Sequence, residues 1–326
     1  MSATTTEHPC LLCTGHYSPL LESFPRGLRV YMRCSNCGLI AEDPTQYDQV
    51  DFDLSKTPDQ LDDHDRKAFH DRYGESIQVA QDDGELYKLY DYDDPQEMRA
   101  AICDRVDAHI KSAHLPERLT VVEVGCADGF LLRELQRRRP GTTVMGIDPS
   151  PVSFEQGSKH GTPMMQGTLE TVDAARLPTA DVAIALGNLM LHENPVRTLE
   201  LMAATTKPNG IIVFDVKNSG CLARASARHL ARTPLKRLRP VRNYVTRNFM
   251  NFRYGFDRKT VVDLTRAAGL ELEELQSVPP RAIAFANQHR GSNGVAGTIW
   301  RLMDAVDRRN QNQAWLEVRA RVPAQR

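Results

Sequence analysis

The sequence has no run of about 18 consecutive apolar residues, so we expect no transmembrane helix. Its first ten residues, MSATTTEHPC, have no basic flank and no apolar stretch, which argues against a secretory signal and favours a cytoplasmic protein. No repeat with a period of roughly 20 to 50 residues is present, which excludes solenoids and propellers. The 326 residues, 41% hydrophobic and 25% charged, have the composition of a globular protein of about two domains.

The chain also lacks a net charge, with 41 basic and 42 acidic residues, which argues against a general polyanion-binding protein. The charge is nevertheless uneven along the chain. Residues 42–97 contain 18 acidic and 5 basic residues, whereas residues 221–260 contain 11 basic residues and one acidic residue. The basic segment either binds an anionic substrate or is a solvated face that docks against the acidic segment.

Four of the seven cysteines are paired in sequence. Cys10 and Cys13, then Cys34 and Cys37, form two C-x2-C pairs separated by 20 residues. Each pair can bring two thiolates to one ion from a tight turn, and two pairs make the tetrahedral set that zinc prefers. Disulfides or free thiols are the alternatives, and the missing secretory signal argues against disulfides. We therefore predict a structural Zn2+ site in a zinc ribbon at residues 1–42.

A nucleotide-binding unit is predicted further along the chain. An acidic linker or cap at residues 43–94 precedes a helix that opens the next domain at residue 95. A buried-strand run at residues 119–124 leads into a glycine-rich turn, residues 125–129, and then into a helix. The following strand ends at Asp148, where a carboxylate can accept hydrogen bonds from both ribose hydroxyls of an adenosine. No Gly-Lys-Ser/Thr sequence follows the turn, which excludes a phosphate-binding P-loop.

NAD and S-adenosylmethionine (SAM) both bind to this layout, and the details favour SAM. An acid, Glu123, lies two residues before the first glycine, and Ala127 stands where a glycine would let a pyrophosphate approach. The later strands also follow a methyltransferase-like order; we predict them at residues 163–166, 181–186, 211–216 and 271–278. The last strand is predicted at residues 315–322, with a hairpin return at 281–285 as the alternative.

These motifs resemble the class I SAM-dependent methyltransferases over residues 95–322, including K-P-N-G at 207–210 and DRKTVVDLTRAAGL at 257–270. The cysteine pairs together with EVGCADGFLLREL are similar to the zinc-containing sugar C-methyltransferases, without their further C-terminal domain. The resemblance implies an α/β fold, a Rossmann-like seven-stranded methyltransferase sheet with its last strand antiparallel, beside the small zinc ribbon. It implies a methyltransferase domain at residues 95–326 with a basic insertion at 217–256.

The resemblance also implies site residues. Those that bind SAM would border its methionine part, its ribose and its adenine; they are Glu123, Gly125, Cys126, Ala127, Gly129, Asp148, Gly167, Thr168 and Leu169. Asn188, which ends the fourth strand, and His192 are the catalytic candidates, with His192 as the base. Alternatively, His192 only bonds to the backbone or caps a turn. The candidate acceptor-binding residues are Lys217, Asn218, Arg253 and Tyr254.

The expected function is therefore methyl transfer from SAM (enzyme class 2.1.1) to a small-molecule acceptor such as a sugar, a nucleotide-linked sugar or a natural-product intermediate. Methyl transfer from a sulfonium requires alignment of nucleophile, methyl group and sulfur more than covalent help. The alternative is an RNA or other nucleic-acid methyltransferase that uses the ribbon and the basic insertion for binding. A SAM-binding scaffold protein without activity is a third possibility.

Overall fold

A computed structural model describes residues 9–19, 31–43, 96–238, 241, 244, 245, 253–278 and 295–324. The predicted acidic linker or cap at 43–94 and the alternative hairpin at 281–285 therefore lie almost wholly outside the described residues. In the described part of the chain, no helix combines the length and the apolar character that crossing a membrane requires.

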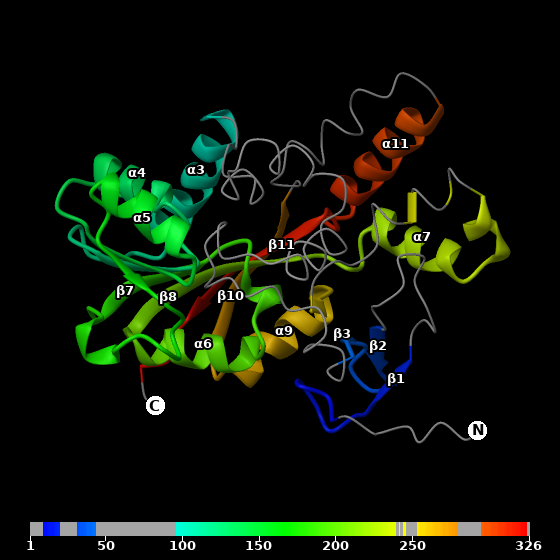
Figure 1. The fold of residues 1–326 in the computed structure, drawn as a ribbon, viewed down its shortest axis with the longest axis horizontal. Helices are drawn as coiled ribbons and strands as arrows, with labels where there is room; N and C mark the ends of the chain where they lie inside the picture. The colour runs from blue at the N-terminus through cyan, green and yellow to red at the C-terminus, as the bar shows by residue number, and fades with distance from the viewer. Residues whose placement is uncertain are drawn as a thin grey trace.

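The larger of two sheets has seven strands, in the order β10-β11-β8-β7-β4-β5-β6 (Figure 1). Their bounds are β4 Thr120–Val124, β5 Thr143–Asp148, β6 Met164–Gln166, β7 Ala180–Ala185, β8 Thr206–Lys217, β10 Glu271–Val278 and β11 Trp315–Arg321. β11 runs antiparallel to both β8 and β10, whereas the pairs among β8, β7, β4, β5 and β6 are parallel. The predicted seven-stranded sheet with an antiparallel last strand is thus confirmed.

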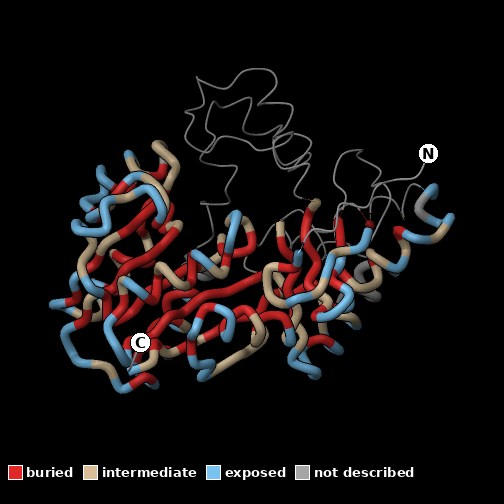
Figure 2. The backbone as a smooth tube through the Cα atoms, turned by 90° about the horizontal axis from the view of Figure 1, so that it is seen from below, coloured by how far each residue is buried: buried red, intermediate tan, exposed pale blue. Residues whose placement is uncertain are grey.

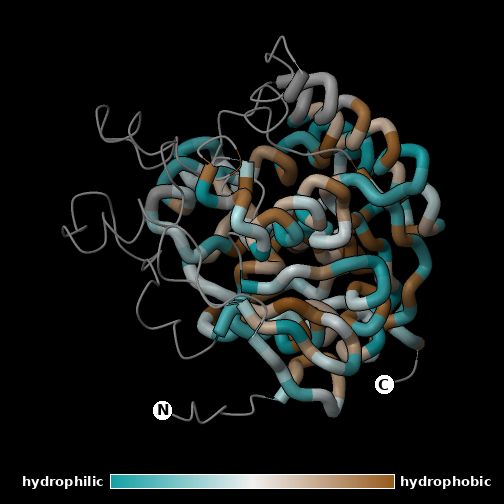
Figure 3. Tube along the Cα trace, turned by 90° about the vertical axis from the view of Figure 1, so that its right-hand side faces the viewer, coloured by the Kyte–Doolittle hydropathy of each residue, from teal (hydrophilic) through white to brown (hydrophobic). Residues whose placement is uncertain are grey.

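Helices cover both faces of this sheet because its central strands are apolar on both sides. One face packs against α3 (Gln96–Ser112) and α4 (Phe130–Arg138), and α5 (Pro151–Lys159) lies beside α4 (Figure 1). The other face packs against α6 (Pro195–Ala204) and α9 (Arg258–Ala267). The strands form the buried centre (Figure 2), while hydrophobic and hydrophilic residues alternate along the outer helices (Figure 3).

The smaller sheet belongs to the cysteine-rich segment and has the order β1-β2-β3-β9. β1 (Tyr17–Pro19), β2 (Tyr31–Cys34) and β3 (Ile40–Glu42) come from the predicted ribbon, whereas β9 (Tyr254–Gly255) comes from the basic insertion. The ribbon core is continuous with the core beneath α6 and α9. The ribbon is therefore fixed to the larger sheet through the insertion and is not a detached module.

Three arginines of the insertion, Arg224, Arg228 and Arg232, are spaced four residues apart and lie on α7 (Leu222–Ala231) and its C-cap. By spacing alone, they would form one basic face of a solvent-exposed helix. Arg224 is instead buried and donates through Nη1 to the carbonyls of Asn218, at 2.8 Å, and Ala314, at 2.6 Å. Arg228 Nη1 donates to the Ser219 carbonyl at 2.6 Å. These backbone carbonyls turn the two arginines inward, so the helix presents less positive charge to solvent than the sequence suggests.

Candidate functional site: the SAM crevice and the cysteine cluster

The glycine-rich turn begins where β4 ends, and its first residue makes room for an amide from another strand end. Gly125 has φ +68°, and a Cβ atom there would lie 2.0 Å from Asn188 Nδ2. That nitrogen donates to the Val124 carbonyl at 2.7 Å. Since 2.0 Å is far below any non-bonded contact, only glycine allows the Asn188 amide to lie across the turn.

Asn188 follows β7 and caps a short 3-10 helix, η6 (Leu189–Leu191). Its Oδ1 atom is buried and has no hydrogen-bond partner among the described residues. Buried polar atoms are rarely left without partners, because an unsatisfied acceptor costs about 1–3 kcal/mol. Since Nδ2 donates to a carbonyl, Oδ1 is left as a buried acceptor beside the glycine-rich turn, unsatisfied within the described part of the chain.

Asp148 closes the opposite side of the turn. Its Oδ2 accepts from the Ala127 N–H at 2.8 Å and its Oδ1 from the Ser150 N–H at 2.9 Å. Burial raises the pKa of this carboxyl, and the hydrogen bonds from Ser150, Ala127 and Ser153 oppose the rise. Two carboxylate oxygens have about four acceptor positions, so hydroxyl donors can still be accommodated. Asp148 both fixes the turn and remains able to bind a diol.

Gly129, another predicted cofactor position, is the N-cap residue of α4. With φ +73°, its missing Cβ makes room for Thr162, whose Cγ2 would lie 2.5 Å from that atom. The other predicted cofactor positions lie in or just after β4 and just after β6. Glu123, Cys126 and Leu169 are buried, and Gly167, which precedes Thr168, donates its N–H to the Asp148 carbonyl at 3.0 Å.

His192 lies at the end of η6, four residues beyond Asn188, and is half-buried. Its Nδ1 is 3.0 Å from Thr198 Oγ1, and that hydroxyl donates to the Asn194 carbonyl at 3.2 Å. With the hydroxyl hydrogen so used, Nδ1–H donates and Nε2 keeps a lone pair. Burial lowers the pKa of His192, Glu170 opposes this and Arg253 adds to it. His192 is therefore neutral at pH 7 and able to accept a proton. Nothing in the sequence spacing indicated that Thr198 would be the hydrogen-bond partner of His192.

The predicted acceptor-binding residues divide into two pairs. Lys217 ends β8 with Nζ 5.7 Å from the Trp315 ring centroid. Asn218 is fully buried; its Nδ2 donates to Gln313 and Asn312, and its Oδ1 accepts from Gly220. The structure thus gives Asn218 a different role, which is to fasten the connection after β8.

Arg253 and Tyr254 form the second pair. Arg253 is half-buried, and its charge acts on His192, so this pair lies on the side of the catalytic candidates. Tyr254 is buried, and its hydroxyl donates to the Glu193 carbonyl at 2.8 Å.

The four paired cysteines meet at one point. Their sulfur atoms all lie within 4.8 Å of one another, with Cys10 and Cys37 at 3.5 Å and Cys13 and Cys34 at 3.5 Å. These separations exceed the roughly 2.05 Å of a disulfide by far. Four sulfurs at about 2.3 Å from a tetrahedral zinc would be about 3.8 Å apart. Burial raises the pKa of the Cys37 thiol, so a cation is needed to hold it as a thiolate. The cluster therefore has the donor set and size of a four-cysteine metal site.

Comparison with known proteins identifies the family. Residues 95–275 match the model of the methyltransferase domain family, which is more than half of the chain. The chain belongs to this methyltransferase family.

Two relatives are ubiquinone biosynthesis O-methyltransferases. The mitochondrial one of Schizosaccharomyces pombe is 31% identical over 40% of this chain and 49% of its own length. That of Bradyrhizobium diazoefficiens is 27% identical over 37% of this chain and 49% of its own length. The match thus spans about half the length of each relative.

Among solved structures, magnesium protoporphyrin IX methyltransferase from Synechocystis is similar, with TM-score 0.45 and 14% identity over 70% of this chain and 85% of its own. Geranyl diphosphate methyltransferase has TM-score 0.44 and 12% identity over 67% of this chain and 84% of its own.

The crevice residues fit SAM. Asp148 would hold the ribose hydroxyls, the Gly125 turn would lie against the methionine part, and Asn188 Oδ1 would receive a donor. SAM supplies a methyl group already activated on a sulfonium, so the chain must bind it, exclude water and direct the nucleophile. His192 Nε2 can take the proton that an oxygen or carbon nucleophile gives up.

SAM affinity should fall as the solution is acidified. The fall should occur at a higher pH than it would if an aspartate with an ordinary pKa bound the ribose. Ribose hydroxyls of a bound SAM would donate to the ionised Asp148, and burial raises the pKa of this carboxyl. Protonation relieves the cost of burying the charge but removes the acceptor, so affinity decreases as pH falls from 7 toward about 4. Calorimetric titration with S-adenosylhomocysteine across this range measures it. In Asp148→Asn the dissociation constant should rise about 10- to 100-fold at pH 7 and lose this pH dependence. An equal slope in both proteins would contradict the assignment.

Proposed function

We propose that this chain transfers the methyl group of SAM to a small-molecule acceptor, a sugar, nucleotide-linked sugar or natural-product intermediate. One arrangement carries the proposal: the Asn188 amide lies across Gly125 with Oδ1 buried and without a hydrogen-bond partner among the described residues, at the same glycine-rich turn whose Ala127 N–H donates to the Asp148 carboxylate. The relatives named as ubiquinone biosynthesis O-methyltransferases support a small-molecule acceptor.

The cysteine cluster is proposed to hold one structural Zn2+. Four cysteine ligands fill a tetrahedral site, so no position is left for a reacting water molecule. The ribbon core is continuous with the core beneath α6 and α9, and the metal would thus stabilise one wall of the methyltransferase domain.

We further propose that the acceptor is anionic. Burial, together with the charges of Arg33, Arg224 and Arg232, lowers the pKa of Arg228 to about 10, while Cys221 opposes the fall. Among the described residues, Arg228 forms no ion pair with a carboxylate. Arg253 adds a positive charge near His192. A phosphate or carboxylate on the acceptor would be attracted by the positive charge that Arg253 places near His192.

Nucleic-acid methylation is not favoured. Arg224 and Arg228 donate to backbone carbonyls and are not presented on a solvent-facing helix surface. A groove that follows a phosphate backbone requires exposed basic residues with aromatic residues among them.

The test is transfer of labelled methyl from SAM to a panel of neutral, phosphorylated and carboxylated small molecules and to total RNA. We expect transfer to an anionic small molecule and none to RNA. His192→Gln should reduce turnover about 10²- to 10⁴-fold, the usual contribution of a general base, while S-adenosylhomocysteine affinity stays unchanged. Arg197→Gln, a change at an exposed residue of α6, is the control and should keep full turnover. Methylation of RNA, or equal turnover of the His192 variant, would contradict the proposal.

A further inference from the structure

A short stretch of the insertion, residues 253–256, joins three parts of the molecule. β9 pairs antiparallel with β3 of the ribbon, and the Glu42 N–H donates to the Arg253 carbonyl at 2.8 Å. The Ser219 N–H, just beyond β8, donates to the Phe256 carbonyl at 2.6 Å. The third connection is to the loop after β7 and is made by one side chain.

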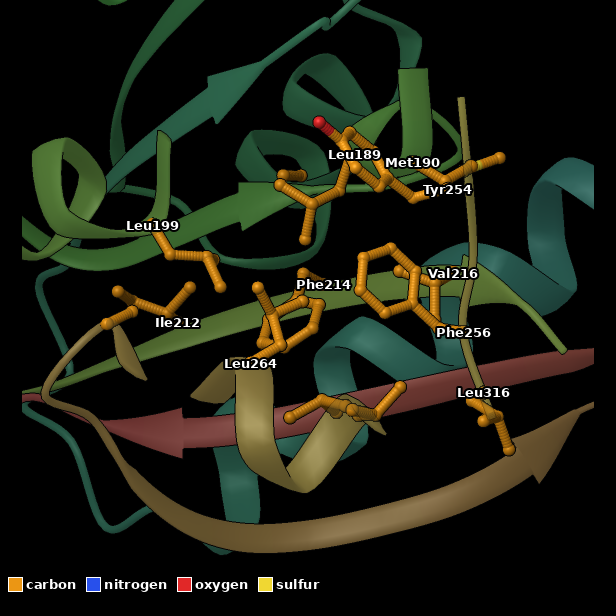
Figure 4. Close-up of a cluster of buried hydrophobic side chains, with 14 of the residues drawn as sticks. Leu189, Met190, Leu199, Ile212, Phe214, Val216, Tyr254, Phe256, Leu264 and Leu316 are labelled. Atoms are coloured by element: carbon orange, nitrogen blue, oxygen red, sulfur yellow. The ribbon is translucent and has the colours of Figure 1, made fainter. Parts of the chain in front are cut away.

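That side chain is Tyr254. Its ring is 7% exposed and lies 6.1 Å from the Phe256 ring, centroid to centroid. Figure 4 shows it beside Leu189 and Met190, the buried residues of η6. Its hydroxyl donates to the Glu193 carbonyl at 2.8 Å. Glu193 directly follows His192, so this hydrogen bond fixes the end of the segment that begins at Asn188.

The segment 188–193 needs such support. It contains one turn of 3-10 helix, a geometry with weak hydrogen bonds that is used only in short pieces. The His192 N–H reaches the Leu189 carbonyl at only 3.3 Å. Short segments of this kind open at a lower free energy than the strands beside them. Yet the segment carries both Asn188, which faces the cofactor crevice, and His192.

We infer that Tyr254 is a positioning residue that holds the Asn188–His192 turn through the Glu193 carbonyl. Because Tyr254 lies on a strand of the ribbon sheet, it makes the geometry of the methyl-transfer site depend on the fold of the four-cysteine ribbon. The ribbon is then a support for the catalytic turn as well as a stabilising module. The importance of this Tyr254 contact for catalysis rests on the proposed methyltransferase function. The dependence of the contact on metal rests on the proposed zinc site.

Tyr254→Phe separates positioning from packing, because it keeps the ring in the core and removes only the hydroxyl. Hydrogen–deuterium exchange of segment 188–193 should become about fivefold faster, the change expected from loss of one neutral hydrogen bond. Exchange in β4, β7 and β8 should not change. The His192 imidazole NMR signals should shift, which a change in packing elsewhere would not cause.

The matched control is Tyr244→Phe. The Tyr244 hydroxyl is bonded to Ser226, at 2.5 Å, and to the Ala223 carbonyl, at 3.2 Å, and both of these partners belong to α7 in the same insertion. This variant should leave both the loop exchange and the His192 signals at their wild-type values. Equal effects of the two substitutions would overturn the positioning role.

The dependence on the ribbon is tested by removing zinc from the full chain with a chelator. Wild-type protein should then show faster exchange at 188–193 and the same His192 shift, whereas Tyr254→Phe should change little further, since its connection is already lost. The coupling would be overturned if zinc removal and Tyr254→Phe had additive effects on the exchange at residues 188–193. It would also be overturned if zinc removal left that exchange unchanged. Calorimetric titration of the wild type with S-adenosylhomocysteine separately reports on the proposed function. If the protein fails to bind S-adenosylhomocysteine, the proposed function fails, but the exchange at residues 188–193 still shows whether Tyr254 positions the turn.

Discussion

Replacing Gly125 with alanine is expected to abolish measurable SAM binding while the sheet stays folded. A Cβ at this position would lie 2.0 Å from Asn188 Nδ2, so the amide must leave the turn and lose its bond to Val124. Displacing the amide also moves Oδ1 away from the crevice. We expect the dissociation constant for S-adenosylhomocysteine to rise at least about 100-fold, because two or more hydrogen bonds worth about 1.5 kcal/mol each are lost together.

Gly161→Ala is the matched control for this change. Gly161 has φ +74°, close to the +68° of Gly125, but a Cβ there would meet nothing within 4 Å. Both substitutions therefore incur the backbone strain of a left-handed residue, about 1–2 kcal/mol, and only the first creates a clash. Gly161→Ala should lower the thermal midpoint slightly and bind S-adenosylhomocysteine as the wild type does. Equal loss of binding in the two variants would show that strain, and not the Asn188 contact, is responsible.

Replacing Cys34 with serine is expected to remove the metal and unfold the ribbon. The proposed zinc is bound by four thiolates. Binding of a structural zinc contributes about 10–16 kcal/mol to the free energy of folding, which is comparable to the stability of an entire domain. The ribbon residues Tyr31 and Leu39 belong to the same buried cluster as Val216 of β8, so unfolding of the ribbon should lower the thermal midpoint of the whole protein while the large sheet stays folded. We expect about one zinc per wild-type chain, none in the variant and a thermal midpoint lower by at least about 5 °C.

Cys103→Ala is the control for the zinc prediction. Cys103 is 1% exposed, on α3, and outside the four-sulfur cluster. Its removal should cost some stability through lost packing but leave the zinc content of the protein unchanged. Elemental analysis of the purified proteins decides the matter. A wild type without zinc, or a Cys34 variant that retains it, would contradict the assignment of the metal site.

The sequence predicted those features whose cause is local. The parallel strands are buried on both faces and are therefore continuous apolar runs, as in Ala180–Ala185. The C-x2-C spacing is likewise a local signal, because two intervening residues allow a tight turn in which both sulfur atoms can bind one metal ion. Asp148 was found because it ends a strand next to a glycine-rich turn, and strand order then places both at one edge of the sheet.

Features that depend on distant partners could not be predicted. β9 is two residues long and pairs with a strand more than 200 positions earlier, so no period or composition signals it. The spacing of Arg224 and Arg228 is that of one helix face. It does not reveal the backbone carbonyls to which the two side chains donate hydrogen bonds. Asn218 was placed correctly at the end of β8, yet only the structure shows that it bonds to Asn312 and Gln313.

SAM is proposed to bind beside Gly125, Asp148 and Asn188, and a crystal structure of the full chain with S-adenosylhomocysteine would show whether it does. We expect both ribose hydroxyls within hydrogen-bond distance of the Asp148 carboxylate, the homocysteine part against the Gly125 turn, and a donor on Asn188 Oδ1. Density for the ligand elsewhere, or a ribose bound by a residue other than Asp148, would contradict it.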